Sequence, residues 1–156
     1  MNLRIFLYPQ HSDTAVDLTI SLIENDADMT SALDIRRIVF IDEQNVPEDI
    51  EVDEFEDDCS HIIARIGGIP VGTARWRRTD NGVKLERFAV LKEYRSKGIG
   101  EALVESVLDY VLPEPVVYLH AQEEVIGFYE KLGFTNEGPT FIEADIVHQK
   151  MVLNAD

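Results

Sequence analysis

Two glycines and a group of cations stand where an apolar segment of the sequence runs into an amphipathic one. Residues 83–90 predict a β-strand, residues 98–111 predict a helix, and this helix opens with Gly98 and Gly100. The first backbone N–H groups of a helix have no partner within it and carry partial positive charge. Glycine lets an anion approach such amides closely, and nearby cations such as Arg95 add formal charge. The segment therefore predicts a binding site for a phosphate or pyrophosphate group.

Two commoner phosphate-binding patterns do not fit this turn. The dinucleotide fingerprint needs a third glycine where this chain has Leu103, and the Walker-type loop needs a Gly-Lys-Ser/Thr run that the sequence lacks. An ordinary glycine-containing turn with surface cations is the alternative. Against it, eight of the 14 Lys and Arg residues fall within residues 75–97, and this concentration in an acidic chain favours an anionic ligand at the helix entrance. These cations are Arg75, Arg77, Arg78, Lys84, Arg87, Lys92, Arg95 and Lys97.

The overall composition excludes several classes of protein. The chain has 156 residues, with 14 Lys or Arg against 30 Asp or Glu and a net charge of −16. This length predicts a single domain, 1–156, and the negative charge argues against a nucleic acid partner. The one cysteine, Cys59, excludes an internal disulfide, and the four histidines are too dispersed to predict a metal site, so we expect no metal. We recognise no targeting segment and no apolar run of membrane-spanning length, and we expect a cytoplasmic protein with no membrane partner.

Hydrophobic periodicity predicts strands and helices along the whole chain. The predicted strands cover residues 3–8, 16–23, 60–66, 69–77, 83–90, 115–119, 140–144 and 147–153. The predicted helices cover residues 30–43, 98–111 and 123–132, and a long acidic loop is expected at 45–58. The expected apolar stripe of the first helix consists of Leu33, Ile38, Phe40 and Ile41. This order predicts one α/β (α+β) sheet with helices on both faces.

Two motifs in this arrangement resemble those of the GNAT superfamily of N-acyltransferases. Arg95-x-x-Gly98-x-Gly100 resembles the acyl-CoA signature of that superfamily. Phe128-Tyr-Glu-Lys-Leu-Gly-Phe134 resembles its next helix, and the order and spacing of the two motifs also match. The resemblance implies a single GNAT domain whose mixed, mostly antiparallel sheet is splayed at a cofactor slot.

A bacterial subgroup of that superfamily, which includes the ElaA-like and YjcF-like proteins, is similar in further segments. The similar segments are Val39-Phe-Ile-Asp-Glu-Gln44, His61, Leu119-His-Ala-Gln122 and Phe141-Ile-Glu-Ala-Asp-Ile-Val-His148. The sequence departs from the subgroup at residues 145–147, which are Asp-Ile-Val where the subgroup has Gly-Ile-Pro. We therefore expect a different terminal turn.

The resemblance implies an acyl-CoA cosubstrate, acetyl-CoA, and a set of residues that binds it. Backbone groups of Phe88, Ala89 and Val90 would bind the pantetheine arm, on a strand that carries a β-bulge. The N–H of Val90 would stabilise the oxyanion, and the amides of residues 95–100 would bind the pyrophosphate. The full implied set is Phe88, Ala89, Val90, Arg95, Ser96, Lys97, Gly98, Ile99, Gly100, Gln122 and Phe128.

The resemblance also implies direct transfer of the acyl group to a primary amine through a tetrahedral intermediate. Tyr129 matches the general acid that would protonate the departing thiolate. A phenol suits that role because its pKa lies near that of a thiol. The alternative is that Tyr129 only packs in the core. We expect Phe128 to point inward with Val125 and Leu132, which leaves Tyr129 facing away from the core.

A general base must accept a proton before an ammonium acceptor can attack. Glu86 precedes Phe88 on the same strand and is either that base or an ion-pair partner of Arg75 or Arg77. His120 is a second candidate, although a lone histidine on a strand is more often structural. The residues expected to line the acceptor pocket are Glu43, Gln44, His61, His120, Glu143 and His148.

Ten of the 17 residues from 42 to 58 are Asp or Glu, and none is Lys or Arg. A negative rim beside the acceptor site would attract a small amine, a polyamine or a basic peptide end. The alternative is a solvated loop, which charge runs usually form. The spacing lacks the EF-hand pattern, so calcium is not expected.

Two other functions compete with an N-acetyltransferase. The first is a non-catalytic acyl-CoA-binding sensor or interaction domain, which would have no need of Tyr129. The second is a nucleotide-phosphate binder, for which the sequence offers no base-recognition element. The resemblance also implies a homodimer, and the predicted strand 3–8 pairs either with the edge of its own sheet or with a second chain.

Overall fold

A single mixed sheet organises the computed structural model, which describes residues 3–9 and 15–154, with side chains from residue 17 onward. Within these residues nine strands run in the order β1-β2-β3-β4-β5-β6-β9-β7, and β8 pairs with β9. The strands are β1 (Leu3–Pro9), β2 (Ala15–Leu22), β3 (Ser60–Ile66), β4 (Ile69–Thr79), β5 (Gly82–Val90), β6 (Val117–Gln122), β7 (Phe134–Asn136), β8 (Phe141–Glu143) and β9 (Ile146–Leu153). Among the described pairs, β5 with β6 is parallel and the others are antiparallel, which confirms the predicted fold class.

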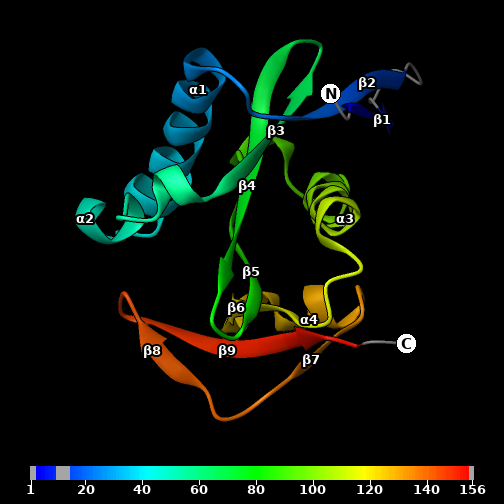
Figure 1. The fold of residues 1–156 in the computed structure, drawn as a ribbon. Helices are drawn as coiled ribbons and strands as arrows, with labels where there is room; N and C mark the ends of the chain where they lie inside the picture. Colours follow the sequence, from blue (N-terminus) through cyan, green and yellow to red (C-terminus); the bar gives the residue numbers. More distant parts are fainter. Residues whose placement is uncertain (1–2, 10–14, 155–156) are drawn as a thin grey trace.

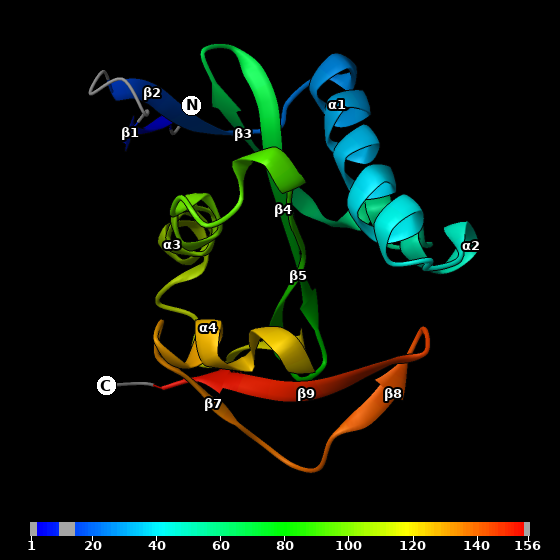
Figure 2. The same ribbon diagram turned by 180° about the vertical axis from the view of Figure 1, so that it is seen from behind.

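The helices cover both faces of this sheet, as predicted. The helical segments are α1 (Asp26–Arg36), the π-helix η1 (Arg37–Glu43), α2 (Glu48–Glu51), α3 (Ile99–Val111), α4 (Ile126–Glu130) and the 3-10 turns η2 (Glu56–Asp58), η3 (Lys92–Tyr94) and η4 (Glu123–Val125). Figure 1 and Figure 2 show α1 and α2 on one side of β3, β4 and β5, and α3 on the other side. None of the helices in the described part of the chain has the length and hydropathy needed to span a membrane.

The amphipathic helix α3 packs as its sequence predicts. Ile99, Leu103 and Val107 are fully buried against the sheet, while Glu101 and Glu105 on the opposite face are exposed. A 3.6-residue apolar period therefore located both the helix and its inner face, because burying an apolar stripe removes it from water.

The first helix turns a different face inward from the one expected. Its buried side chains include Ile35, Arg36 and Val39, whereas Ile38 is exposed. The expected stripe was wrong because Arg36, a charged residue, occupies the core side. Its guanidinium donates to the carboxylates of Glu51 and Glu56, which makes its burial tolerable.

Several element boundaries also differ from the sequence-based expectation. The strand expected at 115–119 is β6, two residues later at its start, and the short strand β7 was not predicted. The acidic segment 45–58 contains the helical turns α2 and η2 and is not a plain loop. At the N-terminus, β1 pairs with β2, the edge of its own sheet.

The turn between β8 and β9 consists of Ala144 and Asp145, which have φ angles of 52° and 61°. A two-residue hairpin in which both central residues have positive φ matches the type I′ class, whose backbone twist fits that of the flanking strands. This tight turn stands where the sequence departs from the Gly-Ile-Pro of the similar subgroup.

Gly82 gives a test of how β6 is held beside β5. Gly82 has a φ angle of 128°, and a Cβ placed on it would lie 2.6 Å from the carbonyl oxygen of Val116. We expect Gly82→Ala to lower the free energy of unfolding by about 1–3 kcal/mol more than Gly68→Ala, because overpacking adds to the strain of a positive φ. Gly68 is the matched control, since its φ is also positive but a Cβ there meets no atom within 4 Å. Equal losses in urea denaturation would contradict this account of the contact.

Candidate active site

A β-bulge bends β5 next to β4. Arg75 pairs with Glu86, and the register then shifts so that Arg87 and Phe88 both lie opposite Ala74. Arg87 has a φ angle of 57°, outside the range of ordinary strand residues. Such a bulge bends the strand and re-aims its side chains. It is the bulge that the resemblance implied for this strand.

The strands β5 and β6 separate just before this bulge. Their parallel pairing runs from Val83 opposite Val117 to Leu85 opposite Leu119, and in the described structure it ends there. A cavity of about 740 Å³ opens between the diverging strands and is lined by residues of both. This volume falls in the range of small-molecule binding sites.

Most of the predicted site residues line this cavity. They are Gln44, Glu86, Phe88, Ala89, Val90, Arg95, Ser96, Ile99, Gly100, His120, Gln122, Phe128, Tyr129, Glu143 and His148. Of the other predicted residues, Lys97 and Gly98 flank the lining in sequence, and Glu43 contacts Arg95. His61 lies apart from the cavity lining, buried with its Nε2 3.1 Å from the carbonyl oxygen of Glu56.

The N-terminus of α3 opens toward the cavity with its backbone amides uncovered by a side-chain cap. Gly98 is the N-cap residue, has a φ angle of 87° and makes no side-chain capping hydrogen bond. A Cβ on Gly100 would lie 3.4 Å from the ring of Phe128, so glycine leaves room between the helix and that ring. Amides in this arrangement attract an anion.

Two hydrogen-bonded bridges join the end of η1 to the walls of the slot. Arg95 donates from Nε to the carbonyl oxygen of Val90 (2.8 Å) and from Nη2 to the carboxylate of Glu43 (2.8 Å). Gln122 donates from Nε2 to Oε1 of Gln44 at 2.8 Å. The guanidinium of Arg95 is therefore engaged by protein groups, and its backbone N–H donates to the carbonyl oxygen of Lys92 at 3.3 Å. The amides of the helix entrance begin at the N-cap residue Gly98.

Tyr129 is buried at the inner wall of the cavity. Its ring centroid lies 5.0 Å from that of Phe128, 5.9 Å from that of Phe134 and 6.2 Å from that of Phe88. Burial raises the pKa of Tyr129 above its ordinary value, so the phenol stays protonated at neutral and mildly alkaline pH.

The expected orientation of this helix was wrong, because Phe128 and Val125 are exposed and Tyr129 is the buried residue. The α-helical part of the segment is only five residues long and follows a 3-10 turn. An α-helical period cannot be projected across such a junction.

Glu86 lies in the ion-paired arrangement that the sequence left as one of two alternatives. Its carboxylate accepts from Nε of Arg75 (2.9 Å) and Nε of Arg77 (3.1 Å), and Nζ of Lys84 lies 3.0 Å away. Burial alone would raise the pKa of Glu86, but the charges of Arg75 and Lys84 and the hydrogen bond from Arg77 outweigh it and lower this pKa to about 2. A carboxylate with so low a pKa is a weak proton acceptor.

The two cavity histidines are fixed by contacts with β8 and β9. Nδ1 of His148 lies 2.8 Å from the carbonyl oxygen of Ile146 and must donate to it, which leaves Nε2 unprotonated in the neutral ring. Phe141 stacks on His148 and meets the ring of His120 edge-on. Burial first, and the charge of Lys84 second, lower the pKa of His120 to about 4. In the described part of the chain, no group of three or more His, Cys, Asp or Glu side chains is arranged to hold a metal ion.

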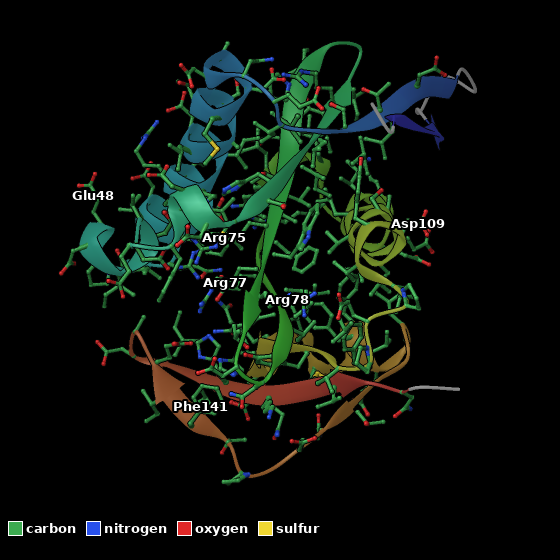
Figure 3. The ribbon with its side chains drawn as sticks, in the orientation of Figure 1. Glu48, Arg75, Arg77, Arg78, Asp109 and Phe141 are labelled. Atoms are coloured by element: carbon green, nitrogen blue, oxygen red, sulfur yellow. The ribbon has the colours of Figure 1, made fainter. Side chains whose placement is uncertain are left out.

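The acidic segment is only partly a solvated rim. Nη2 of Arg75 contacts Asp53 at 2.7 Å, and Nε of Arg36 contacts Glu51 at 2.6 Å. Glu56 accepts from both arginines. The remaining acidic residues between 48 and 58 are exposed: Glu48, Asp49, Glu54, Asp57 and Asp58. In Figure 3, Glu48 lies at the outer edge of α2, whereas Arg75 and Arg77 lie between α1, α2 and the sheet.

The sequence predicted that the cations between residues 75 and 97 gather at the helix entrance. This prediction was wrong for several of them. Arg77, Lys84 and Arg87 line the cavity among residues of η1 and the acidic segment, and Arg75 is buried behind them. Arg78, the next residue of β4, pairs with Glu114 instead. Adjacent residues of a strand point to opposite faces, so the sequence could have predicted that Arg77 and Arg78 lie on different sides of β4. No local pattern predicts the bulge that directs Arg87 into the cavity.

Comparison with known proteins gives consistent matches. The family described as acetyltransferase (GNAT) domain matches residues 28–155. The N-acetyltransferase YjcF of Bacillus subtilis (strain 168) is 35% identical over 134 residues, which cover 84% of this chain and 96% of YjcF. The protein ElaA of Escherichia coli (strain K12) is 30% identical over 123 residues, which cover 74% of this chain and 80% of ElaA.

Two solved structures also match this chain over most of its length. The crystal structure of Escherichia coli ElaA has a TM-score of 0.77 and 26% identity, and the match covers 88% of this chain and 99% of that one. The crystal structure of an acyl-CoA N-acyltransferase from Pseudomonas aeruginosa has a TM-score of 0.78 and 27% identity, and the match covers 89% of this chain and 99% of that one.

The ion pairs of Glu86 give a test at low pH. The pKa of Glu86 is about 2 in the folded chain against an ordinary 4.5, so its stabilising effect is complete above about pH 4.5 and is lost as the pH falls toward 2. We expect Glu86→Gln to lower the free energy of unfolding by about 3 kcal/mol at pH 7, because it removes one side of a buried ion pair. The deficit should shrink as the pH falls from 4.5 to 2 in urea titrations. Glu101→Gln, on the exposed face of α3, is the control, and a deficit that stays constant with pH would contradict the assignment.

Proposed function

The chain belongs to the acetyltransferase (GNAT) family, and on that premise we propose that it transfers the acetyl group of acetyl-CoA to a primary amine. The observation that carries this proposal is the separation of β5 from β6, with an uncapped helix N-terminus at the same cavity. N-acetyltransferase activity is that of the family, and its acceptors are amines. The choice of acetyl-CoA and the roles of individual residues are part of the proposal.

The residues present suit an acyl-CoA. Among the described residues, the edge of β5 that faces β6 has no strand paired with it beyond Leu85, so its backbone groups are available to the amides of a pantetheine arm. The amides that follow Arg95, at the start of α3, suit a pyrophosphate. The aromatic rings of Phe88 and Phe128 supply an apolar wall between these two polar regions.

The reaction needs three groups from the protein: a donor to the oxyanion, a general acid and a general base. Acetyl-CoA supplies an activated acyl group and a thiolate leaving group. In this proposal the N–H of Val90 donates to the carbonyl oxygen as negative charge develops on it, and the phenol of Tyr129 donates its proton to the thiolate. The position of Tyr129 in the cavity lining supports this role, and its burial, which raises its pKa, keeps the phenol protonated before the thiolate forms.

The proton of the acceptor ammonium needs a base. Glu86 is ill suited, since its low pKa reflects a carboxylate fully engaged by cations. His148 lines the cavity, and its Nδ1 hydrogen bond leaves Nε2 free to accept a proton. We therefore assign proton acceptance to His148, directly or through a water molecule, and a positioning role to Glu86.

Acetyl-CoA binding is the first test. We expect isothermal titration of the purified protein to show acetyl-CoA and CoA binding. Arg95→Glu should weaken both by about tenfold or more, because it sets a negative charge beside the phosphates and breaks the bridge to Glu43. Arg78→Glu reverses a cation on β4 outside the cavity and should leave binding unchanged. Absence of acetyl-CoA binding to the unmodified chain would remove the proposed function.

Tyr129→Phe tests the acid. We expect this variant to bind acetyl-CoA within about threefold of the unmodified chain, while kcat with an amine acceptor falls by about 10²- to 10⁴-fold. Tyr110→Phe, at a ring that stacks on Trp76 away from the cavity, is the matched control and should retain kcat. Unchanged kcat in Tyr129→Phe would exclude the phenol as the acid. Acetyl-CoA binding without turnover of any amine would favour the non-catalytic alternative.

A further inference from the structure

The acceptor end of the cavity is built on a network of buried charges that is not neutral. Its carboxylates are Glu51, Asp53, Glu56 and Glu86, and its cations are Arg36, Arg75, Arg77, Lys84 and Arg87. Within these ion pairs five positive groups share four negative ones, in a chain whose net charge is −16. Two further carboxylates, Glu124 and Glu143, line the same cavity. His61, which touches the network at Glu56, stays neutral because burial lowers its pKa.

Arg77 and Lys84 are the cations of this network with the fewest carboxylate partners. Arg75 is matched by three carboxylates, since it contacts Asp53, Glu56 and Glu86. Among the described residues, the ion pairs of Arg77 and Lys84 both go to Glu86, at 3.1 Å and 3.0 Å. One carboxylate shared among three cations cannot neutralise all of them.

Both of these cations face the cavity. The side chains of Arg77 and Lys84 line it and are 18% and 14% exposed. The guanidinium of Arg77 lies 3.9 Å from the ring centroid of Phe55. Its Nε and Nη2 donate to the two carboxylate oxygens of Glu86 at 3.1 Å and 3.3 Å, so Nη1 is the remaining donor for a bound anion. Burial first, and the charge of Lys84 second, lower the pKa of His120, so the charge of Lys84 acts within this part of the cavity.

We propose that the acceptor is an amine that also carries a carboxylate, and that Arg77 and Lys84 bind this carboxylate while the amine lies at the slot. The inference rests on the proposed function. An anion here completes the charge balance of the network, and a guanidinium beside an ammonium is a strong site for a carboxylate. A diamine or polyamine would instead bring a second positive charge against two under-neutralised cations. Glu48, Asp49, Glu54, Asp57 and Asp58 of the segment 48–58 are exposed, so their charges are screened more strongly than those of the ion-paired carboxylates.

The separation of the two ends sets the size of the acceptor. Lys84 precedes Phe88 by four residues on β5, which is roughly 13 Å at most for a regular strand. The bulge at Arg87 and the long side chains of Lys84 and Arg77 shorten this span. We therefore choose a flexible ω-amino acid, with several methylenes between its charges, as the acceptor class that can adapt to it. Glu143 and Glu124 also line the cavity, and their carboxylates are available to an ammonium group.

A matched set of acceptors tests the distal charge. The probes are 6-aminohexanoate, 6-aminohexanamide and 1,6-diaminohexane, with acetyl-CoA and release of the CoA thiol as the readout. We expect kcat/KM for the carboxylate to exceed that for the amide by about tenfold or more, as charged hydrogen bonds provide, and the diamine to be the poorest. Lys84→Met should reduce the carboxylate-to-amide ratio to about threefold or less. Arg78→Met, which removes a cation from β4 outside the cavity, should keep the ratio.

A second measurement needs no turnover. Isothermal titration of 6-acetamidohexanoate and 6-acetamidohexanamide into the protein, alone and with CoA, compares the two products directly. We expect the carboxylate to bind about tenfold tighter and Lys84→Met to abolish the difference. Equal binding of the two products, no binding of either, or preference for the diamine in turnover would overturn the inference while leaving the N-acetyltransferase in place. Failure of acetyl-CoA to bind in the separate titration would instead count against the proposed function.

Discussion

The buried guanidinium of Arg75 is the group on which the acceptor side of the structure depends. It lies on β4 with no exposure to solvent, and a charge in that position costs several kcal/mol unless carboxylates surround it. Two of its partners, Asp53 and Glu56, come from the acidic segment, and the third, Glu86, comes from β5. The acidic segment therefore folds against the sheet because β4 carries an arginine there. The buried Arg75 thus holds in place two residues of the cavity wall, Asp53 and Glu86.

The bulge in β5 divides the cavity into two chemically different halves. Beyond the bulge, β5 offers unpaired backbone and aromatic rings, and the helix α3 offers amides, so this half suits a long, flexible molecule with phosphates at one end. Before the bulge, the same strand offers Lys84 and Glu86, and Arg87 turns toward the backbone carbonyl of Glu51. Tyr129 lies in the apolar region, where burial keeps its proton in place. In the proposed function, the bulge at Arg87 and Phe88 would thus separate the part of the cavity that binds acyl-CoA from the part that binds the acceptor.

Much of the fold and part of the site could be predicted from the sequence, and the failures share a cause. The helix α3 and its glycine entrance follow from local periodicity and from what glycine permits, so Ile99–Val111 packs as expected. The slot beside β5 was expected only from the resemblance to the family. The inner face of α1 was wrong because Arg36 is buried by carboxylates 15 and 20 residues away, which no local pattern shows. The prediction that Phe128 is buried and Tyr129 is exposed was wrong, because their helix is a short α-helical segment that follows a 3-10 turn. The division of the cations between two sites depends on which strand face each occupies and on a bulge, both of which are set by the folded sheet.

The uncapped start of α3 links the stability of the folded chain to the binding of an anionic ligand. A helix whose first amides lack a side-chain cap is incomplete, and an anion that settles there supplies the missing acceptor. Any molecule that binds only the folded state stabilises it by an amount that grows with the logarithm of its concentration above the dissociation constant. Under the proposed function, a bound acyl-CoA would therefore raise the free energy of unfolding of this chain as well as take part in its reaction.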